Sequence, residues 1–300
     1  MSSWNGTRRL SLSPRLIRRL QAAFRRDIAA EFLEFVAALE AEYTLAQIEE
    51  LVETGNVSTV IARFTTLAGG LGSTVVAAHV RAGLEEARRT IGFSFDQTNP
   101  RAAAALRAAR IRVVGGLTQQ QTDSLVESVR TGVNPRESAR QIKDALGLTA
   151  RQSKQLANLR RALAQGDSKA LSSKLRDRRF DRTIRRAMRG EITLTSEQIE
   201  RILSRQRARM IAHRAEVIAR TEALRAANVG SREAVQQAIE EGLIQSSQVV
   251  RTWNTAGDSR VREPAHTSLN QQKRGQDEYF LSGEQTEVVA DHLNKNIVDF

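Results

Sequence analysis

The sequence has no cysteine, which excludes disulfides, Cys-ligated zinc and thiol catalysis. Aromatic residues make up only 4% of the chain, whereas Ala, Leu, Ile and Val are plentiful. This composition suits packed helices better than a β-sandwich. No P-loop, Rossmann glycine pattern or G-x-S-x-G string occurs, so the sequence supports neither nucleotide hydrolysis nor serine esterase chemistry.

Long apolar segments are also missing. Residues 1–19 do not contain the apolar core of a secretory signal. The longest uncharged run, residues 64–80, is short for a membrane span and contains Gly69, Gly70 and Gly72. We therefore expect a buried helix pair or a tight bend in this run, and no stable membrane insertion.

Positive charge is abundant and unevenly placed. The formal net charge is +12, and residues 151–190 alone hold 13 basic and 3 acidic side chains. Most of the basic residues are Arg, whose planar donor fork fits both phosphate and carboxylate groups. Nucleic acid and an acidic protein surface are therefore both natural partners, and composition does not choose between them.

The pattern predicts a mainly α fold with long helices in its N-terminal and middle regions and a small α+β domain at the C-terminal end. Residues 1–115 form the expected N-terminal helical region, which Ser13 and Pro14 open with a cap and a suitable first residue. Residues 116–190 form a basic helical region, and residues 191–300 form the α+β domain. We expect helix breaks at Gly69–Gly72 and at Gly115–Gly116, because glycine disfavours helix interiors.

The basic region contains one dense block of Arg and Lys. Apolar residues at helical spacing accompany this block, so an anchored face is expected behind the charge. Two interpretations remain open: contact with phosphates, or a solvated surface paired with acidic residues. No Tyr or Trp is interleaved, so a stacking platform for single strands is missing. The candidate nucleic-acid-binding residues are Lys174, Arg176, Arg178, Arg179, Arg182, Arg185, Arg186 and Arg189.

A long helical run, Glu197 to Val229, dominates the last region, and we expect it to end or bend at Asn228–Gly230. Within it, Glu216 and Arg220 are spaced for one ion pair, and Glu222 and Arg225 for another. Whether these pairs lie on the surface or turn inward is open. Residues 248–252 then read as a strand that leads to Trp253.

A polar cluster follows the tryptophan: Asp258, Arg260, Arg262 and His266 fall within nine residues. Such a set suits phosphate binding, general acid–base work or a network that holds a small domain together. We interpret it as structural and packed against the long helix. One His and one Asp fall short of a zinc site, so we expect neither metal nor cofactor.

Two strings carry a resemblance: I-A-R-T-E-A-L-R-A-A-N-V-G (218–230) and W-N-T-A-G-D-S-R-V-R-E-P-A-H-T-S-L (253–269). Together they resemble the core of the phage Mu F-like head morphogenesis family, whose members are minor capsid proteins. The matching residues are Arg220, Thr221, Glu222, Asn228, Gly230, Trp253, Thr255, Asp258, Arg262 and His266. Family members often finish with a Pro-rich stretch and a C-R-C-like end, which this Cys-free chain lacks.

The resemblance implies a structural component of a phage head and no enzyme. It places the chain at the portal vertex or the capsid interior, and in the host cytoplasm during assembly. The implied partners are the portal protein and major capsid or scaffold proteins. Three points remain open: contact with packaged double-stranded DNA through the Arg-rich region, departure with the genome at ejection, and a homo-oligomer. Two alternatives stand beside this interpretation. One is a nuclease- or transferase-like enzyme that uses Asp258, Arg262 and His266, and the other is a sequence-independent DNA-binding protein.

Overall fold

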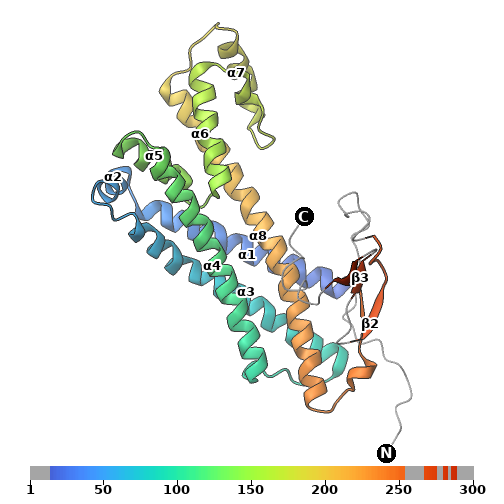
Figure 1. The fold of residues 1–300 in the computed structure, drawn as a ribbon. Coiled ribbons are helices and arrows are strands. Elements are labelled where there is room, and N and C mark those ends of the chain that lie inside the picture. Colours follow the sequence, from blue (N-terminus) through green and yellow to red (C-terminus); the bar gives the residue numbers. More distant parts are fainter. Residues whose placement is uncertain (1–13, 254–266, 276–279, 283–284, 289–300) are drawn as a thin grey trace, which may run out of the picture. The chain divides into compact units, whose positions relative to one another are not determined.

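The chain is mainly α-helical, as the sequence predicts. The structure, a computed structural model, describes residues 14–253, 267–275, 280–282 and 285–288. The α-helices within these residues are α1 (Pro14–Glu42), α2 (Leu45–Glu53), α3 (Ser58–Glu86), α4 (Pro100–Thr131), α5 (Pro135–Ala145), α6 (Ala150–Gln165), α7 (Asp181–Met188) and α8 (Ser196–Glu240) (Figure 1). Short π and 3-10 turns are η1 (Ala87–Ile91), η2 (Ser168–Leu171), η3 (Arg178–Phe180) and η4 (Ser246–Gln248).

Local capping signals set several helix starts. Thr44 and Thr149 each form a capping box at the starts of α2 and α6, with Gln47 and Gln152 as the reciprocal partners. The side chain of Asn134 accepts a hydrogen bond at the start of α5, which has proline at its first position. These interactions reach only three residues along the chain, which is why the sequence alone locates these starts correctly.

The expected breaks at Gly69–Gly72 and Gly115–Gly116, and an end of the helix at Asn228–Gly230, are wrong. α3, α4 and α8 run through these positions without interruption. A glycine costs a helix about 1 kcal/mol relative to alanine, a penalty that tertiary packing overrides. Gly72 shows how: a Cβ there would lie 2.8 Å from Val114 Cγ2, so the missing side chain lets α3 approach α4 closely.

The chain divides into two compact units, and α1, α3, α4 and α8 contribute residues to both. Unit 1 is drawn from residues 1–24, 76–107 and 220–300, and unit 2 from residues 25–75 and 108–219. This division differs from the three sequential regions 1–115, 116–190 and 191–300 that the sequence suggests. Each unit is assembled from segments far apart along the chain, and no linear reading of composition reveals that.

The core of unit 2 is aromatic at its centre. Phe35 lies edge-to-face against both Phe32 and Phe64, with ring centroids 5.3 and 4.9 Å apart. α2 packs against α5, and their residues Ile48 and Ile142 are fully buried. Unit 2 therefore has an apolar core of its own, which holds the polar residues described below in fixed positions.

Unit 1 joins the end of α3, the start of α4 and the C-terminal part of α8. Phe95 packs with Ala87, Ala102 and Ala234 in a small buried cluster. Gln237 of α8 secures the preceding connection, because its amide donates to Asp96 O at 2.7 Å and its carbonyl accepts from Asp96 N at 3.0 Å.

Short strands follow α8, as expected near Trp253. β1 (Val250–Thr252) pairs antiparallel with β2 (Lys273–Gly275), with Val250 opposite Gly275. β3 (Phe280–Ser282) pairs antiparallel with β4 (Gln285–Val288).

The segment Ser58–Ile91 is the one stretch, within the described part of the chain, whose length and apolar composition would allow it to cross a membrane. One of its faces is a core face, because Val60, Phe64, Leu71 and Val75 are fully buried. Length and composition do not distinguish a core helix from a membrane span, so the absence of membrane insertion stays a prediction.

Candidate functional site

The family-like string of α8 lies in unit 1, and part of it turns inward. Arg225 Nη1 donates a hydrogen bond to Glu222 Oε1 at 2.6 Å, and both side chains are largely buried. Spacing left open whether this pair lies on the surface or turns inward, and the structure shows that it turns inward. Arg220 and Thr221 are half-buried, and Asn228 is exposed.

The second expected pair has a different partner. Glu216 contacts Arg25 of α1 and not Arg220, its neighbour one turn along α8. Arg25 comes from a helix that lies about 190 residues earlier in the sequence. Helical spacing identified Glu216 as an ion-pair residue, but only the packing of α1 against α8 within unit 2 selects its partner.

Gly230 is the point of closest approach between α8 and α3 in unit 1. A Cβ at this position would lie 2.7 Å from Ala82 Cβ and 2.9 Å from Gly83 N, and closer still to His79 O. Gly83 faces Gly230 in return, since a Cβ on Gly83 would lie 3.2 Å from Gly230 O. The glycine that was expected to end or bend the helix therefore marks a helix crossing.

Trp253 anchors the second family-like string at its start. Its backbone N–H donates to Gln272 O at 3.0 Å, and its carbonyl accepts from Gln271 N at 2.8 Å. These bonds continue the β1–β2 ladder, so the two flanks of the string are joined. Four of the predicted residues, namely Thr255, Asp258, Arg262 and His266, lie outside the described residues, as does Arg260.

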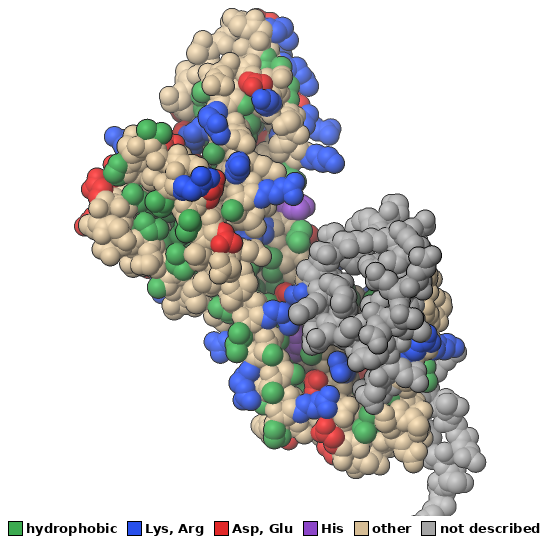
Figure 2. Space-filling view, viewed as in Figure 1, with side chains coloured by type: hydrophobic (Ala, Val, Ile, Leu, Met, Phe, Trp, Pro, Cys, Tyr) green, Lys and Arg blue, Asp and Glu red, His purple; other side chains and the backbone are tan. Residues whose placement is uncertain are grey.

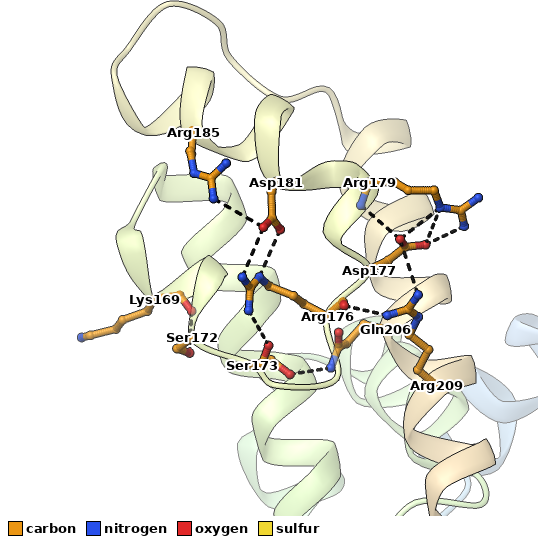
Figure 3. A network of polar contacts seen from close by, with 10 residues as sticks. All are labelled: Lys169, Ser172, Ser173, Arg176, Asp177, Arg179, Asp181, Arg185, Gln206 and Arg209. Atoms are coloured by element: carbon orange, nitrogen blue, oxygen red, sulfur yellow. Dashed lines mark hydrogen bonds and ion pairs between the residues drawn. The ribbon is translucent and has the colours of Figure 1, made fainter.

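The basic block of unit 2 is organised around three carboxylates, of which two are buried. The first is Asp181 at the start of α7 (Figure 3). Arg176 grips it with two bonds, from Nε to Oδ1 at 3.0 Å and from Nη2 to Oδ2 at 3.2 Å. Arg185, one turn along α7, adds a longer contact at 3.5 Å. Arg176 also donates to Ser173 O at 3.2 Å, so this guanidinium ties the preceding loop to the helix.

Asp177 is the second carboxylate, and it caps η3 (Figure 3). Arg179 donates to it from Nη2 at 2.6 Å and from Nε at 3.0 Å, and Arg209 of α8 lies 3.6 Å away. The hydrogen bonds from Arg179 lower the pKa of Asp177 from 3.8 to about 2 and raise the pKa of Arg179. Asp177 is therefore ionised at neutral pH and holds two arginines.

Glu191 is the third carboxylate, beyond the end of α7. It accepts from Arg189 Nε at 2.5 Å and from Arg186 Nε at 3.2 Å. The Arg189 hydrogen bond is the main cause that lowers the pKa of Glu191. Unlike the two aspartates, Glu191 is exposed, so solvent screens these pairs.

The eight predicted binding residues therefore fall into two groups. Five of them pair with an acidic side chain of the same block: Arg176, Arg179, Arg185, Arg186 and Arg189. The other three, Lys174, Arg178 and Arg182, are exposed and have no ion-pair partner among the described residues. Figure 2 shows Lys and Arg side chains gathered on the surface of this part of unit 2.

Arg214 is a site residue that sequence reasoning missed. It is only 5% exposed, yet no acidic partner lies beside it in the described part of the chain. It donates to Gly147 O at 2.6 Å and to Gln120 Oε1 at 2.7 Å, and its guanidinium lies 5.5 Å from the centre of the Phe32 ring. Burial lowers the pKa of Arg214 to about 10.

Arg207 acts beside it on the same turn between α5 and α6. It donates to Asp144 O at 2.8 Å and to Leu146 O at 2.6 Å, and it pairs with Glu40 at 2.5 Å. Arg207 and Arg214 are seven residues apart, with Met210 between them on the same helical face. The signal in the sequence for these contacts of Arg207 and Arg214 was the presence of arginine within an apolar stripe of the helix.

A further groove of unit 2 lies apart from the predicted site residues. A groove of about 480 Å³ between α4, α5 and α6 is lined by Glu127, Asp144, Lys154 and Arg160 among others, and by none of the predicted site residues. Among the described residues, no group of three His, Cys, Asp or Glu side chains is placed to hold a metal ion.

No family model, curated protein or solved structure matches this chain. The likeness to the head morphogenesis family thus depends on the residues quoted for the two strings, and membership in the family stays a prediction.

Proposed function

We propose that the chain is a minor capsid protein of the head morphogenesis type, a structural component at the portal vertex or capsid interior of a phage head. One observation carries the proposal: two of the family-like residues of α8, Glu222 and Gly230, serve internal packing. Glu222 is buried against Arg225, and Gly230 lies at backbone contact with α3. Such roles fit a string that specifies a scaffold, and we propose no catalytic activity and no cofactor.

The length of α8 adds support. It has 45 residues, so at 1.5 Å per residue it is roughly 67 Å long. A helix of this length offers an extended surface to neighbouring subunits. The partners we propose are the portal protein and major capsid or scaffold proteins, with the host cytoplasm as the place of assembly.

The direct test is mass spectrometry of purified heads that were assembled in cells producing this chain. We expect the chain at low copy number, together with portal and capsid proteins, after the particles have been separated from free protein by density gradient. Particles that contain no trace of the chain would overturn the proposal.

A matched pair of variants tests whether the α8 string matters for incorporation. Gly230→Leu introduces a side chain where backbone atoms lie, whereas Gly116→Ala adds a methyl group at a position with no neighbouring atom within 4 Å. We expect heads to lose the Gly230→Leu chain and to keep the Gly116→Ala chain. Equal incorporation of both would show that the packing of this string is irrelevant to assembly.

A further inference from the structure

The arginines of η3 and α7 form a basic stripe. Arg182, Arg185, Arg186 and Arg189 follow at spacings of three, one and three residues, which keeps them on one side of α7 and its C-cap, and Arg178 precedes them in η3. All five are exposed, whereas Ile184 on the opposite side of α7 is buried, as is Asp181, which lies one turn before Arg185 at the edge of the stripe. The stripe spans roughly 16 Å at 1.5 Å per residue.

The buried side of this segment fixes the stripe in place. Asp181 binds Arg176, and Asp177 binds Arg179 and Arg209, so the loop before α7 is tied to α8 (Figure 3). Because the buried side of this helix is fixed by these contacts, the cations on its exposed side stand at defined positions. This lowers the ordering cost of a partner that contacts several of them together.

The surface suits a phosphate backbone better than a protein partner. From residue 134 to residue 216, all of which the structure describes, no large apolar side chain is exposed. Protein interfaces have an apolar core, whereas nucleic-acid interfaces are polar and strongly positive. Phe180 is the one aromatic residue between 151 and 216 and is half-buried, so a stacking platform for single strands is missing.

We propose that this face binds the backbone of double-helical nucleic acid, with Glu191 as a built-in competitor for the phosphates. Lys174, Arg178 and Arg182 contact phosphates directly, because no acidic side chain within the described ranges pairs with them. Glu191 accepts the Nε–H of both Arg186 and Arg189 and offsets part of their charge, so these two arginines bind phosphates more strongly once they leave Glu191. Both pairs are about half exposed, so they exchange readily.

This inference rests on the proposed function only for the source of the duplex, which would be packaged DNA. It also differs from a simple basic patch. In a patch of eight equal cations the loss of any one charge would have the same effect, whereas here Arg186 and Arg189 contribute fully only when Glu191 no longer pairs with them.

The test is fluorescence anisotropy of the full chain with a labelled DNA duplex of mixed sequence, across a series of salt concentrations. Affinity falls as salt rises, and each neutralised phosphate adds about 0.9 to the magnitude of the slope of log affinity against log salt concentration. We expect the first triple variant to lower this slope by about 2.7. The control triple variant, which removes the same charge at exposed positions outside the stripe, should leave the slope nearly unchanged. The first variant is Lys174→Ala/Arg178→Ala/Arg182→Ala, and the control is Arg26→Ala/Arg107→Ala/Arg136→Ala.

Glu191→Gln is the decisive single change, because it frees Arg186 and Arg189 without touching a basic residue. We expect tighter duplex binding and a slope increased by up to about 1.8. Equal losses in both triple variants, or weaker binding by Glu191→Gln, would overturn the proposal. So would binding to a poly-glutamate peptide but not to duplex, which would indicate an acidic protein partner. If the chain does not bind duplex but is found in purified heads, the inference fails and the proposed virion role is unaffected. If the chain binds duplex but is missing from heads, only the virion role fails.

Discussion

Replacing Gly230 with alanine tests the helix crossing on which unit 1 depends. The added Cβ would meet Ala82 Cβ at 2.7 Å and Gly83 N at 2.9 Å, and it would also crowd His79 O. Two of these three atoms belong to the backbone of α3 and cannot rotate away. α3 and α8 would therefore have to separate to admit one methyl group.

The magnitude follows from two opposing effects. Overpacking a tightly packed interior costs about 1–3 kcal/mol, whereas Gly→Ala within a helix gains about 1 kcal/mol. Because backbone atoms cause the clash, we expect a cost near the upper end of that range. The net result is a free energy of unfolding lowered by about 2 kcal/mol.

Two other glycines supply matched controls in the same assay, thermal unfolding followed by far-UV circular dichroism. Gly116→Ala meets no atom within 4 Å and should gain the helix term alone, about 1 kcal/mol. Gly83→Ala meets the Phe95 ring at 3.0 Å and Gly230 O at 3.2 Å, which are longer contacts than those of Gly230→Ala, so its effect should fall between the other two. For domains of 150–250 residues, 1 kcal/mol moves Tm by about 2–4 °C. If Gly230→Ala melts at or above the wild-type temperature, the close approach of α3 and α8 is refuted.

Two further predictions concern buried and paired charges. Arg214→Ala should lower the free energy of unfolding by about 2–4 kcal/mol in urea titrations, because Gly147 O and Gln120 Oε1 lose their donor. Arg214→Met should lower it less, since methionine keeps the apolar stem while the buried charge is removed. An equal loss for both variants would contradict this. The pKa of Asp177 is about 2 in the folded chain and close to 3.8 when unfolded, so its ionised form stabilises the fold fully above about pH 4 and this contribution is lost as the pH falls toward 2. Asp177→Asn should therefore weaken the dependence of stability on pH between 4 and 2, and an unaltered dependence would count against the Arg179 contact.

The motif residues show how far spacing reaches. The spacing of Glu222 and Arg225 predicted their pairing, and the structure confirms it. Spacing predicted Glu216 with Arg220 equally well, yet Glu216 contacts Arg25. Helical periodicity identifies which residues share a face, but it carries no information about what another helix places opposite that face.

The basic block likewise shows that spacing does not determine which residues pair. Its sequence displays an excess of Arg and three nearby acidic residues, so pairing with acidic residues and contact with phosphates were both open. Only the fold assigns Asp181 to Arg176 and Arg185, and Glu191 to Arg186 and Arg189. The separation of held from unpartnered cations depends on distances of 2.5–3.5 Å, which no pattern of residue types specifies.

The sequence by itself determined the helical class of the chain and the starts of α2, α5 and α6, because capping groups and apolar periodicity act over a few neighbouring residues. Only the tertiary structure decided what the glycines do and where Arg214 lies. Whether Gly230 ends a helix or admits a neighbour depends on α3, about 150 residues earlier in the chain, and such contacts form only when the units assemble.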